Sequence, residues 1–170
     1  MLSEHVVQFY GENERDLLQR VRLFISQGLA RNEAVLVITN PRRTDALFQG
    51  LDLSQTPGLT AVDATMLCDQ LYYGGPISAE HFETHVGSLV RRLSARARSR
   101  GLRVYGDIVD ELWNSNRRED AIDLERYWND LQAQVPFTLY CAYHVEPQDV
   151  GSDVMAPVLH EHSSLVPALG

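Results

Sequence analysis

Short apolar runs alternate with amphipathic segments along the chain, and this alternation limits the possible folds more than any other feature. The runs are rich in β-branched and aromatic residues and cover 5–10, 34–39, 59–62, 102–105 and 137–143. The segments between them carry apolar residues at helical spacing. Five strands alternating with helices predict one α/β domain, a three-layer sandwich with a mostly parallel sheet.

The expected helices follow from the same spacing. They lie after Asn13, around 46–51, and over 64–71, 78–100, 107–115 and 118–133. The clearest amphipathic helix is the long one capped by Ser78, which is expected to end at Gly101. Periodicity is weak beyond Pro147, where 154–159 fits either a strand or a turn of helix. Residues 1–170 are expected to form one domain, with a core of about 5–146 and a C-terminal segment of 147–170.

Charge and composition exclude several classes of protein. All fifteen basic residues are Arg, so the chain has no lysine for a Walker A loop or a Schiff base. The net charge of −8 argues against direct binding to nucleic acid. The apolar run 34–38 is far shorter than the roughly 20 residues of a membrane span, and no signal peptide pattern opens the sequence. A cytoplasmic location without a membrane partner is expected.

Enzyme motifs are missing as well. The turn after the first strand reads Gly11-Glu12-Asn13-Glu14, and its carboxylates would repel a phosphate. No Gly-x-Ser-x-Gly elbow occurs, and neither Cys68 nor Cys141 has the context of an activated thiol. We therefore expect no catalysis, no cofactor and no disulfide.

Asp107 is the first candidate for function. The strand at 102–105 leads into Gly106-Asp107 and then into a helix, which is how open α/β sheets build ligand sites. Asp is also a favoured helix N-cap, so Asp107 has a structural interpretation too. Both alternatives stay open at this stage. Polar and aromatic residues near the predicted strand ends complete the expected ligand site: Tyr10, Asn40, Asp63, Asp107, Trp113 and His144.

Histidines and acidic residues gather near the C-terminus. His160-Glu161-His162 invites a metal interpretation with His5, His144 or Cys141, but no known metal-ligand spacing accompanies it, so no metal site is predicted.

Trp128 lies in an apolar stripe of the helix expected over 118–133 and is expected in the core. Glu125 and Asn129, one turn apart, are expected to tie this helix to the sheet through hydrogen bonds.

A run of arginines lies on and after the long helix in an otherwise acidic chain. Such a run is usually a solvated face. The sharper hypothesis is a docking surface at Arg91, Arg92 and Arg96 for an acidic partner, because guanidinium groups pair carboxylates in a two-pronged geometry. DNA is a weaker third option, since no helix-turn-helix pattern is present.

Four segments in fixed order resemble the MEDS family of sensory domains. They are HVVQFYG at 5–11, Gly106-Asp107 leading to Leu112-Trp113, LERYWNDL at 124–131 and FTLYCAY at 137–143. The chain departs from the family pattern at Asp107, where Glu is usual, and at Leu159, near which a Cys is common. The Asp107 carboxylate is one methylene shorter than that of Glu and reaches less far from the backbone.

The resemblance implies a fold related to RecA-type ATPases without a working phosphate loop. It also implies a non-catalytic sensory domain for small organic ligands, simple hydrocarbon derivatives, that signals to a kinase, an anti-sigma factor or a transcription regulator. No output domain is expected in this chain, so the signal would leave through a partner protein or a homodimer. The alternative is a protein-interaction adaptor, a degenerate ATPase-like fold that binds no ligand.

Overall fold

The computed structural model describes residues 3–167 and contains a six-stranded sheet in which every neighbouring pair is parallel. The strands are β1 (His5–Tyr10), β2 (Ala34–Thr39), β3 (Leu59–Asp63), β4 (Leu102–Gly106), β5 (Thr138–His144) and β6 (Ser164–Leu165). Their order across the sheet is β3-β2-β4-β5-β1-β6. The predicted α/β class is confirmed, and β6 is a strand that the sequence did not indicate.

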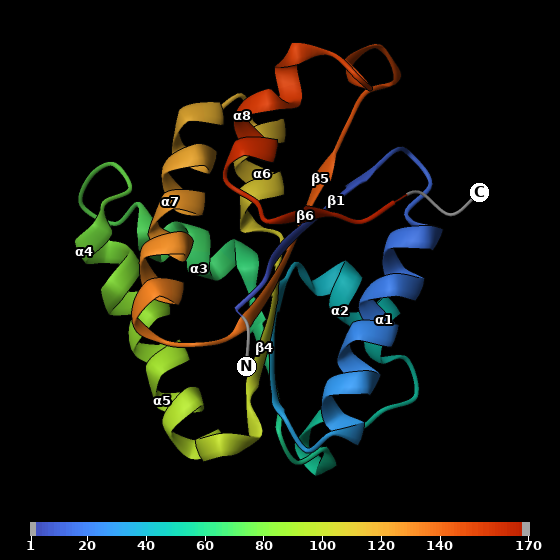
Figure 1. Cartoon of the computed structure of the whole chain (residues 1–170), viewed down its shortest axis with the longest axis vertical. Coiled ribbons are helices and arrows are strands. Elements are labelled where there is room, and N and C mark those ends of the chain that lie inside the picture. The colour runs from blue at the N-terminus through green and yellow to red at the C-terminus, as the bar shows by residue number, and fades with distance from the viewer. Residues whose placement is uncertain (1–2, 168–170) are drawn as a thin grey trace.

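Helices cover both faces of this sheet, which Figure 1 shows nearly edge-on. One face carries α1 (Arg15–Ala30) and α2 (Pro41–Phe48). The other carries α3 (Ala64–Leu71), α4 (Ala79–Phe82), α5 (Ser88–Ala97), α6 (Ile108–Asn114), α7 (Arg118–Gln134) and α8 (Ala156–His160). For residues 154–159 the sequence fitted either a strand or a turn of helix. The structure shows the helical alternative, with the 3₁₀ turn Asp153–Met155 followed by α8.

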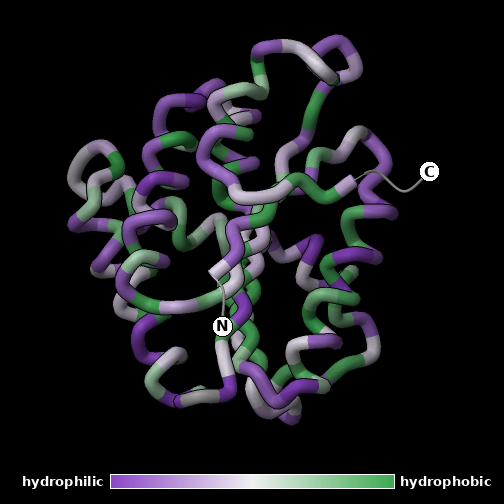
Figure 2. The backbone as a smooth tube through the Cα atoms, viewed as in Figure 1, coloured by the Kyte–Doolittle hydropathy of each residue, from purple (hydrophilic) through white to green (hydrophobic). Residues whose placement is uncertain are grey.

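The sheet separates two hydrophobic cores. Leu17, Val21 and Phe24 of α1 are buried against the face of β2 that carries Val35 and Val37. The opposite face is covered by the larger core under α3 to α8. The hydrophobic colour in Figure 2 accordingly runs along the central strands. β2 reads as a continuous apolar run because both of its faces are buried.

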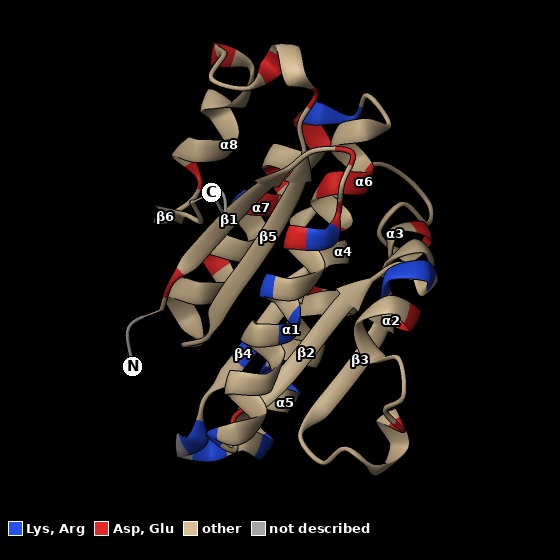
Figure 3. Cartoon of the chain, turned by 90° about the vertical axis from the view of Figure 1, so that its right-hand side faces the viewer, with Lys and Arg blue, Asp and Glu red and all other residues tan. Residues whose placement is uncertain are grey.

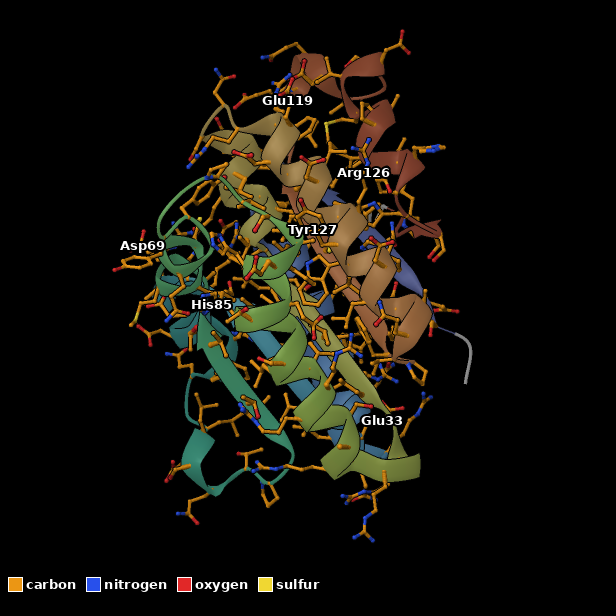
Figure 4. The ribbon with its side chains drawn as sticks, turned by 90° about the vertical axis from the view of Figure 1, so that its left-hand side faces the viewer. Glu33, Asp69, His85, Glu119, Arg126 and Tyr127 are labelled. Atoms are coloured by element: carbon orange, nitrogen blue, oxygen red, sulfur yellow. The ribbon has the colours of Figure 1, made fainter. Side chains whose placement is uncertain are left out.

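The long helix expected over 78–100 is present but is interrupted by a change of helix type. A π-helical turn, Glu83–Gly87, separates α4 from α5, and Figure 4 labels His85 within it. Phe82 before the turn, Val86 within it and Val90 after it all face the core, so the apolar spacing alone does not reveal the interruption.

The chain leaves the sheet toward opposite faces at the carboxyl ends of β2 and β4. These strands are neighbours, yet α2 follows β2 onto one face and α6 follows β4 onto the other. Open α/β sheets place their ligands at such a divergence. Within residues 3–167, no helix combines the length and the apolar character that crossing a bilayer requires.

Candidate functional site

Asp107 lies at this divergence and is fully buried. Its Oδ2 accepts hydrogen bonds from Thr39 Oγ1 at 2.5 Å and from Arg43 Nη1 at 2.7 Å. Asp107 occupies the N-cap position of α6, but its side chain makes no capping hydrogen bond. The interpretation of Asp107 as a side-chain cap is therefore wrong. Its carboxylate instead faces Arg43, a buried residue of α2, the helix that follows the neighbouring strand β2.

Arg43 is the centre of the site and is 5% exposed. Its Nη2 donates to Glu14 Oε1 at 2.9 Å and also to the hydroxyl of Tyr10. The Tyr10 hydroxyl in turn donates to Asp110 Oδ2. We call this set the Arg43 network: Tyr10, Glu14, Thr39, Arg43, Asp107 and Asp110.

Asp110 joins the network to β5. Its Oδ1 accepts from the backbone N–H of His144 at 2.6 Å and from Asn114 Nδ2 at 2.8 Å. The carboxyl ends of β1, β2, β4 and β5 are thereby connected through one chain of buried polar contacts. Two of its atoms are left over: Asp107 Oδ1 and Arg43 Nε are buried and have no hydrogen-bond partner among residues 3–167.

The electrostatics of the network follow from burial and from one guanidinium facing three carboxylates. Burial raises the pKa of Asp107, and Arg43 only partly offsets that effect. Burial also raises the pKa of Glu14, but the hydrogen bond and charge of Arg43 outweigh it, so this pKa lies below its usual range. Burial lowers the pKa of Arg43, but Asp107 and Glu14 raise it by more than that. The net shift is upward, so the guanidinium stays charged. The pKa of Tyr10 is raised by burial and by Asp110.

Four of the six residues expected in a ligand site lie in the Arg43 network or next to it. Tyr10 and Asp107 are members of the network, and the His144 ring lies edge-on to Tyr10 with centroids 5.5 Å apart. Asn40 caps α2 by accepting from the backbone N–H of Arg43 at 3.0 Å. Asp63 instead caps α3, accepting from Thr65 N at 2.8 Å, outside the network.

Trp113 lies elsewhere, at the far end of α6. Its ring is edge-on to Tyr143 at 5.6 Å, and the guanidinium of Arg118 lies 4.8 Å from its centroid. It borders a cleft of about 650 Å³ that also includes Glu119 and Arg126 of α7, both labelled in Figure 4, and residues of the C-terminal segment. This cleft does not include Asp107, so the structure does not bring Trp113 and Asp107 into one pocket.

A second group of polar residues lies inside the larger core. It consists of His5 from β1, Glu125 from α7, Cys141 from β5 and His162 from the turn after α8, and we call it the His5 cluster. One potential ligand atom from each residue lies within 4.8 Å of all the others. His5 Nε2 is 3.1 Å from Glu125 Oε2 and 3.5 Å from Cys141 Sγ.

Glu125 is the charged centre of the His5 cluster. Burial would raise its pKa, but the imidazoles of His162 and His5 beside it outweigh that effect and hold this pKa well below its usual range. For His162, burial lowers the pKa and Glu125 raises it, with a net rise. The pKa of Cys141 is well above its usual range because of burial and Glu125. The carboxylate therefore organises both the imidazoles and the thiol.

A match to a family sequence profile shows which family the chain belongs to. The profile of the methanogen/methylotroph, DcmR sensory domain, abbreviated MEDS, matches residues 4–163, nearly the whole chain. The chain belongs to the MEDS family.

Other comparisons of this MEDS domain add little. A search of curated proteins found no match. Among solved structures, the domain is similar to Thermomonospora curvata EccC (ATPases 2 and 3) in complex with a signal sequence peptide. The TM-score is 0.48 and the identity 13%, and the alignment covers 93% of this chain but only 28% of the EccC chain. Likeness at this level carries no argument about fold or function.

The three arginines of the expected docking surface, Arg91, Arg92 and Arg96, differ in whether they have partners within the MEDS domain. Arg91 donates to Glu83 Oε1 at 2.8 Å and to Gln134 Oε1 at 2.8 Å, so it links the π-helical turn to α7. Arg92 and Arg96 are exposed and form no ion pair within the described part of the chain. Figure 3 shows basic residues gathered at the end of α5, while acidic residues are spread over the rest.

The sequence interpretation missed Arg43, Asp110 and the role of Glu125 in the His5 cluster. One feature of the sequence could have indicated that Arg43 is buried: it precedes the buried Leu47 by four residues and so shares its helix face. Glu125 likewise follows Ala121 by four residues. The predicted ties of α7 to the sheet are confirmed, since Tyr143 donates to Glu125 at 2.7 Å and Asn129 Oδ1 contacts His5 Nδ1 at 2.8 Å. Trp128 is in the core, as expected.

Proposed function

We propose that this MEDS domain senses a small organic molecule, which binds in the Arg43 network at the carboxyl edge of the sheet. The observation that supports this most is the pair of buried, unpartnered atoms Asp107 Oδ1 and Arg43 Nε. Buried polar atoms nearly always have partners, because leaving one unpaired costs about 1–3 kcal/mol. A site that keeps one spare acceptor and one spare donor is suited to a ligand that supplies both.

A hydroxyl group fits that requirement. It donates one hydrogen bond to a carboxylate oxygen and accepts one from a guanidinium N–H. The family description, a sensory domain of methanogens and methylotrophs, agrees with ligands of this size. We therefore expect small alcohols to bind better than halocarbons or carboxylic acids, since an acid would add a fourth carboxylate to a network that already holds three.

The signal would begin at the junction of α2 and α6. Arg43 belongs to α2, whereas Asp107 directly precedes α6 and Asp110 lies within it. A ligand that takes over hydrogen bonds of Arg43 changes how the two helices are held together. The response would then pass to a separate cytoplasmic protein, such as a kinase, an anti-sigma factor or a transcription regulator, or to a second copy of the domain.

Calorimetry with a panel of small alcohols, amines, acids and halocarbons tests the proposal. Asp107→Asn should weaken binding of the best alcohol about 10- to 100-fold, the loss of one hydrogen bond to a charged group. Asp63→Asn is the matched control, because Asp63 is also a carboxylate at a strand end but lies outside the network. Equal affinities of wild type and Asp107→Asn, with both proteins folded, would contradict the proposal.

Tryptophan fluorescence gives a second readout of the same event. The chain has two tryptophans, and Trp113 ends α6 while Trp128 is in the core. In Trp128→Phe, ligand should change the emission of Trp113, because α6 carries the network residue Asp110. In Trp113→Phe the change should be much smaller. Calorimetric binding without any change in Trp113 emission would show that α6 is not the responding element.

A protein-interaction adaptor is the second candidate function, and one observation favours it. Arg92 and Arg96 are exposed on the basic end of an acidic domain and form no ion pair within the described residues. Such guanidinium groups are available for carboxylates of a partner. Capture of a partner without binding of any compound in the panel would support the adaptor over the sensor.

A further inference from the structure

We propose that the His5 cluster is a tetrahedral transition-metal site with Zn²⁺ as its best-fitting ion. Its four residues come from positions 5, 125, 141 and 162, which the fold alone brings together. The inference does not depend on the Arg43 network.

The spacing of the donor atoms suits a small ion. Tetrahedral zinc with ligand bonds of about 2.0–2.3 Å places neighbouring donors about 3.5 Å apart. Within the cluster, His5 Nε2 is 3.1 Å from Glu125 Oε2, His162 Nε2 is 3.3 Å from Glu125 Oε1, and Cys141 Sγ is 3.6 Å from Glu125 Oε2. Small shifts of side chains would therefore place four donors around one ion.

Both imidazoles are held in the orientation that metal ligands need. His162 Nδ1 lies 2.6 Å from the backbone carbonyl of Val158, an acceptor, so Nδ1 carries the proton. His5 Nδ1 lies 2.8 Å from Asn129 Oδ1. Asn129 Nδ2 donates to Glu161, which fixes the amide with its oxygen toward His5. Each ring thus directs Nε2 into the cluster, as ligating histidines do when their other nitrogen donates to an acceptor.

His162 supplies an independent observation. Its side chain is 1% exposed, and its Nε2 has no hydrogen-bond partner among the described residues although it lies 3.3 Å from Glu125 Oε1. A buried imidazole nitrogen that points at a carboxylate without a hydrogen bond is costly as it stands. A cation between the two groups removes that cost.

The donor set identifies the ion. Two imidazoles, a thiolate and a carboxylate are ligands of Zn²⁺ and related divalent ions, whereas Mg²⁺ and Ca²⁺ require oxygen ligands. Binding displaces the thiol proton, so Zn²⁺ with the Cys141 thiolate and the Glu125 carboxylate makes an electrically neutral unit. A neutral unit is far less costly to bury than an isolated charge. Four protein ligands leave no open position, so the site is structural and fastens the C-terminal segment to β1.

The test uses the full chain after treatment with a chelator, titrated with Co²⁺ in an absorbance cell and with Zn²⁺ in a calorimeter. We expect one ion per chain, the visible bands of tetrahedral Co²⁺ and a near-ultraviolet charge-transfer band from the thiolate. Cys141→Ser should lose the charge-transfer band, and His162→Gln should weaken Zn²⁺ binding at least 10-fold. Zn²⁺ should also raise the melting temperature of the wild type.

Two control variants match these changes. Cys68→Ser removes the other cysteine, and His160→Gln removes an exposed histidine two residues before His162. Both should keep the full Co²⁺ spectrum and the wild-type affinity for Zn²⁺. Circular dichroism separates loss of a ligand from loss of the fold, and if Cys141→Ser is unfolded, His162→Gln decides. Co²⁺ that keeps its pale octahedral spectrum with wild type, or a charge-transfer band that follows Cys68, would overturn the inference.

Discussion

Arg43 Nη1 lies 2.7 Å from Asp107 Oδ2, and this buried pair joins two helices that leave neighbouring strands toward opposite faces of the sheet. One ion pair therefore connects the two layers of helices through the carboxyl edge. Breaking a buried pair from one side leaves an unpaired charge, which typically costs about 3–5 kcal/mol. The Arg43 network consequently bears on the stability of the domain as well as on its proposed ligand.

Tyr10→Phe tests the network without changing any formal charge. The variant removes the hydroxyl that accepts a hydrogen bond from Arg43 Nη2 and donates one to Asp110 Oδ2. We expect the free energy of unfolding to fall by about 1–3 kcal/mol, measured by urea denaturation. Tyr73→Phe, at a residue that is 84% exposed, should change it by less than about 0.5 kcal/mol. Equal effects at both positions would show that the hydroxyl contacts of Tyr10 do not stabilise the fold.

Glu14→Gln should make the domain less sensitive to acid. Because Arg43 holds the pKa of Glu14 below its unfolded value of about 4.3, ionised Glu14 contributes stability above that pH. This contribution is lost as the pH falls through the folded pKa. Urea denaturation between about pH 6 and pH 3 should therefore show a smaller loss of stability for Glu14→Gln than for wild type. Glu12→Gln, at an exposed residue of the same turn, should follow the wild-type curve.

Gly28→Ala should destabilise α1 although alanine is the better helix former. A methyl group at this position would lie 2.9 Å from Arg103 Cδ and 2.9 Å from Val35 Cγ2. The overlap should cost about 1–3 kcal/mol, more than the roughly 1 kcal/mol that alanine normally gains over glycine. Ser26→Ala, at an exposed position of the same helix, should be neutral or slightly stabilising. A higher melting temperature for Gly28→Ala would refute this packing argument.

Reversing Arg91, Arg92 and Arg96 to Glu should abolish capture of an acidic partner if this surface docks one. The melting temperature should change little, because exposed ion pairs contribute about 0–1 kcal/mol. Arg91→Glu alone is the informative control, since this residue is paired with Glu83 and Gln134. It should preserve capture, whereas Arg92→Glu with Arg96→Glu should not. Mass spectrometry of cross-linked complexes provides the measurement.

ATP with magnesium should neither bind at micromolar concentration nor be hydrolysed. The turn after β1 offers Glu12 and Glu14, and Glu14 is already paired with Arg42 and Arg43. A phosphate there would meet carboxylates where it requires backbone amides and a lysine. Calorimetry checks binding, and release of phosphate checks turnover. A micromolar dissociation constant would contradict this reading of the turn.

Local patterns predicted β1 and β2 with their observed bounds, because each is a compact apolar run between clear breakers. β6 escaped prediction because Ser164 and Leu165 are two exposed residues, too few to show a period. The π-helical turn escaped because the apolar residues keep their face across it.

The candidate site was predictable only in part. Tyr10 and Asp107 lie at the ends of clear strands, and parallel strands bring their carboxyl ends to one edge. Arg43 and His162 act through partners distant in sequence, at separations of 64 residues for Arg43–Asp107 and 158 residues for the neighbouring Ser163–His5 contact. Such pairings depend on the order of strands across the sheet, which no local pattern encodes.

The short strand β6 covers part of the outer border of β1. Among the described residues, β6 pairs with β1 at Val6 and Val7, and the segment that supplies this pairing also carries His162 into the core. Withdrawal of that segment would leave the outer border of β1 with unpaired amides and carbonyls. A strand border in that state pairs readily with a strand from another molecule. By pairing with β1, the C-terminal segment therefore covers backbone groups that a strand from another molecule would otherwise find open.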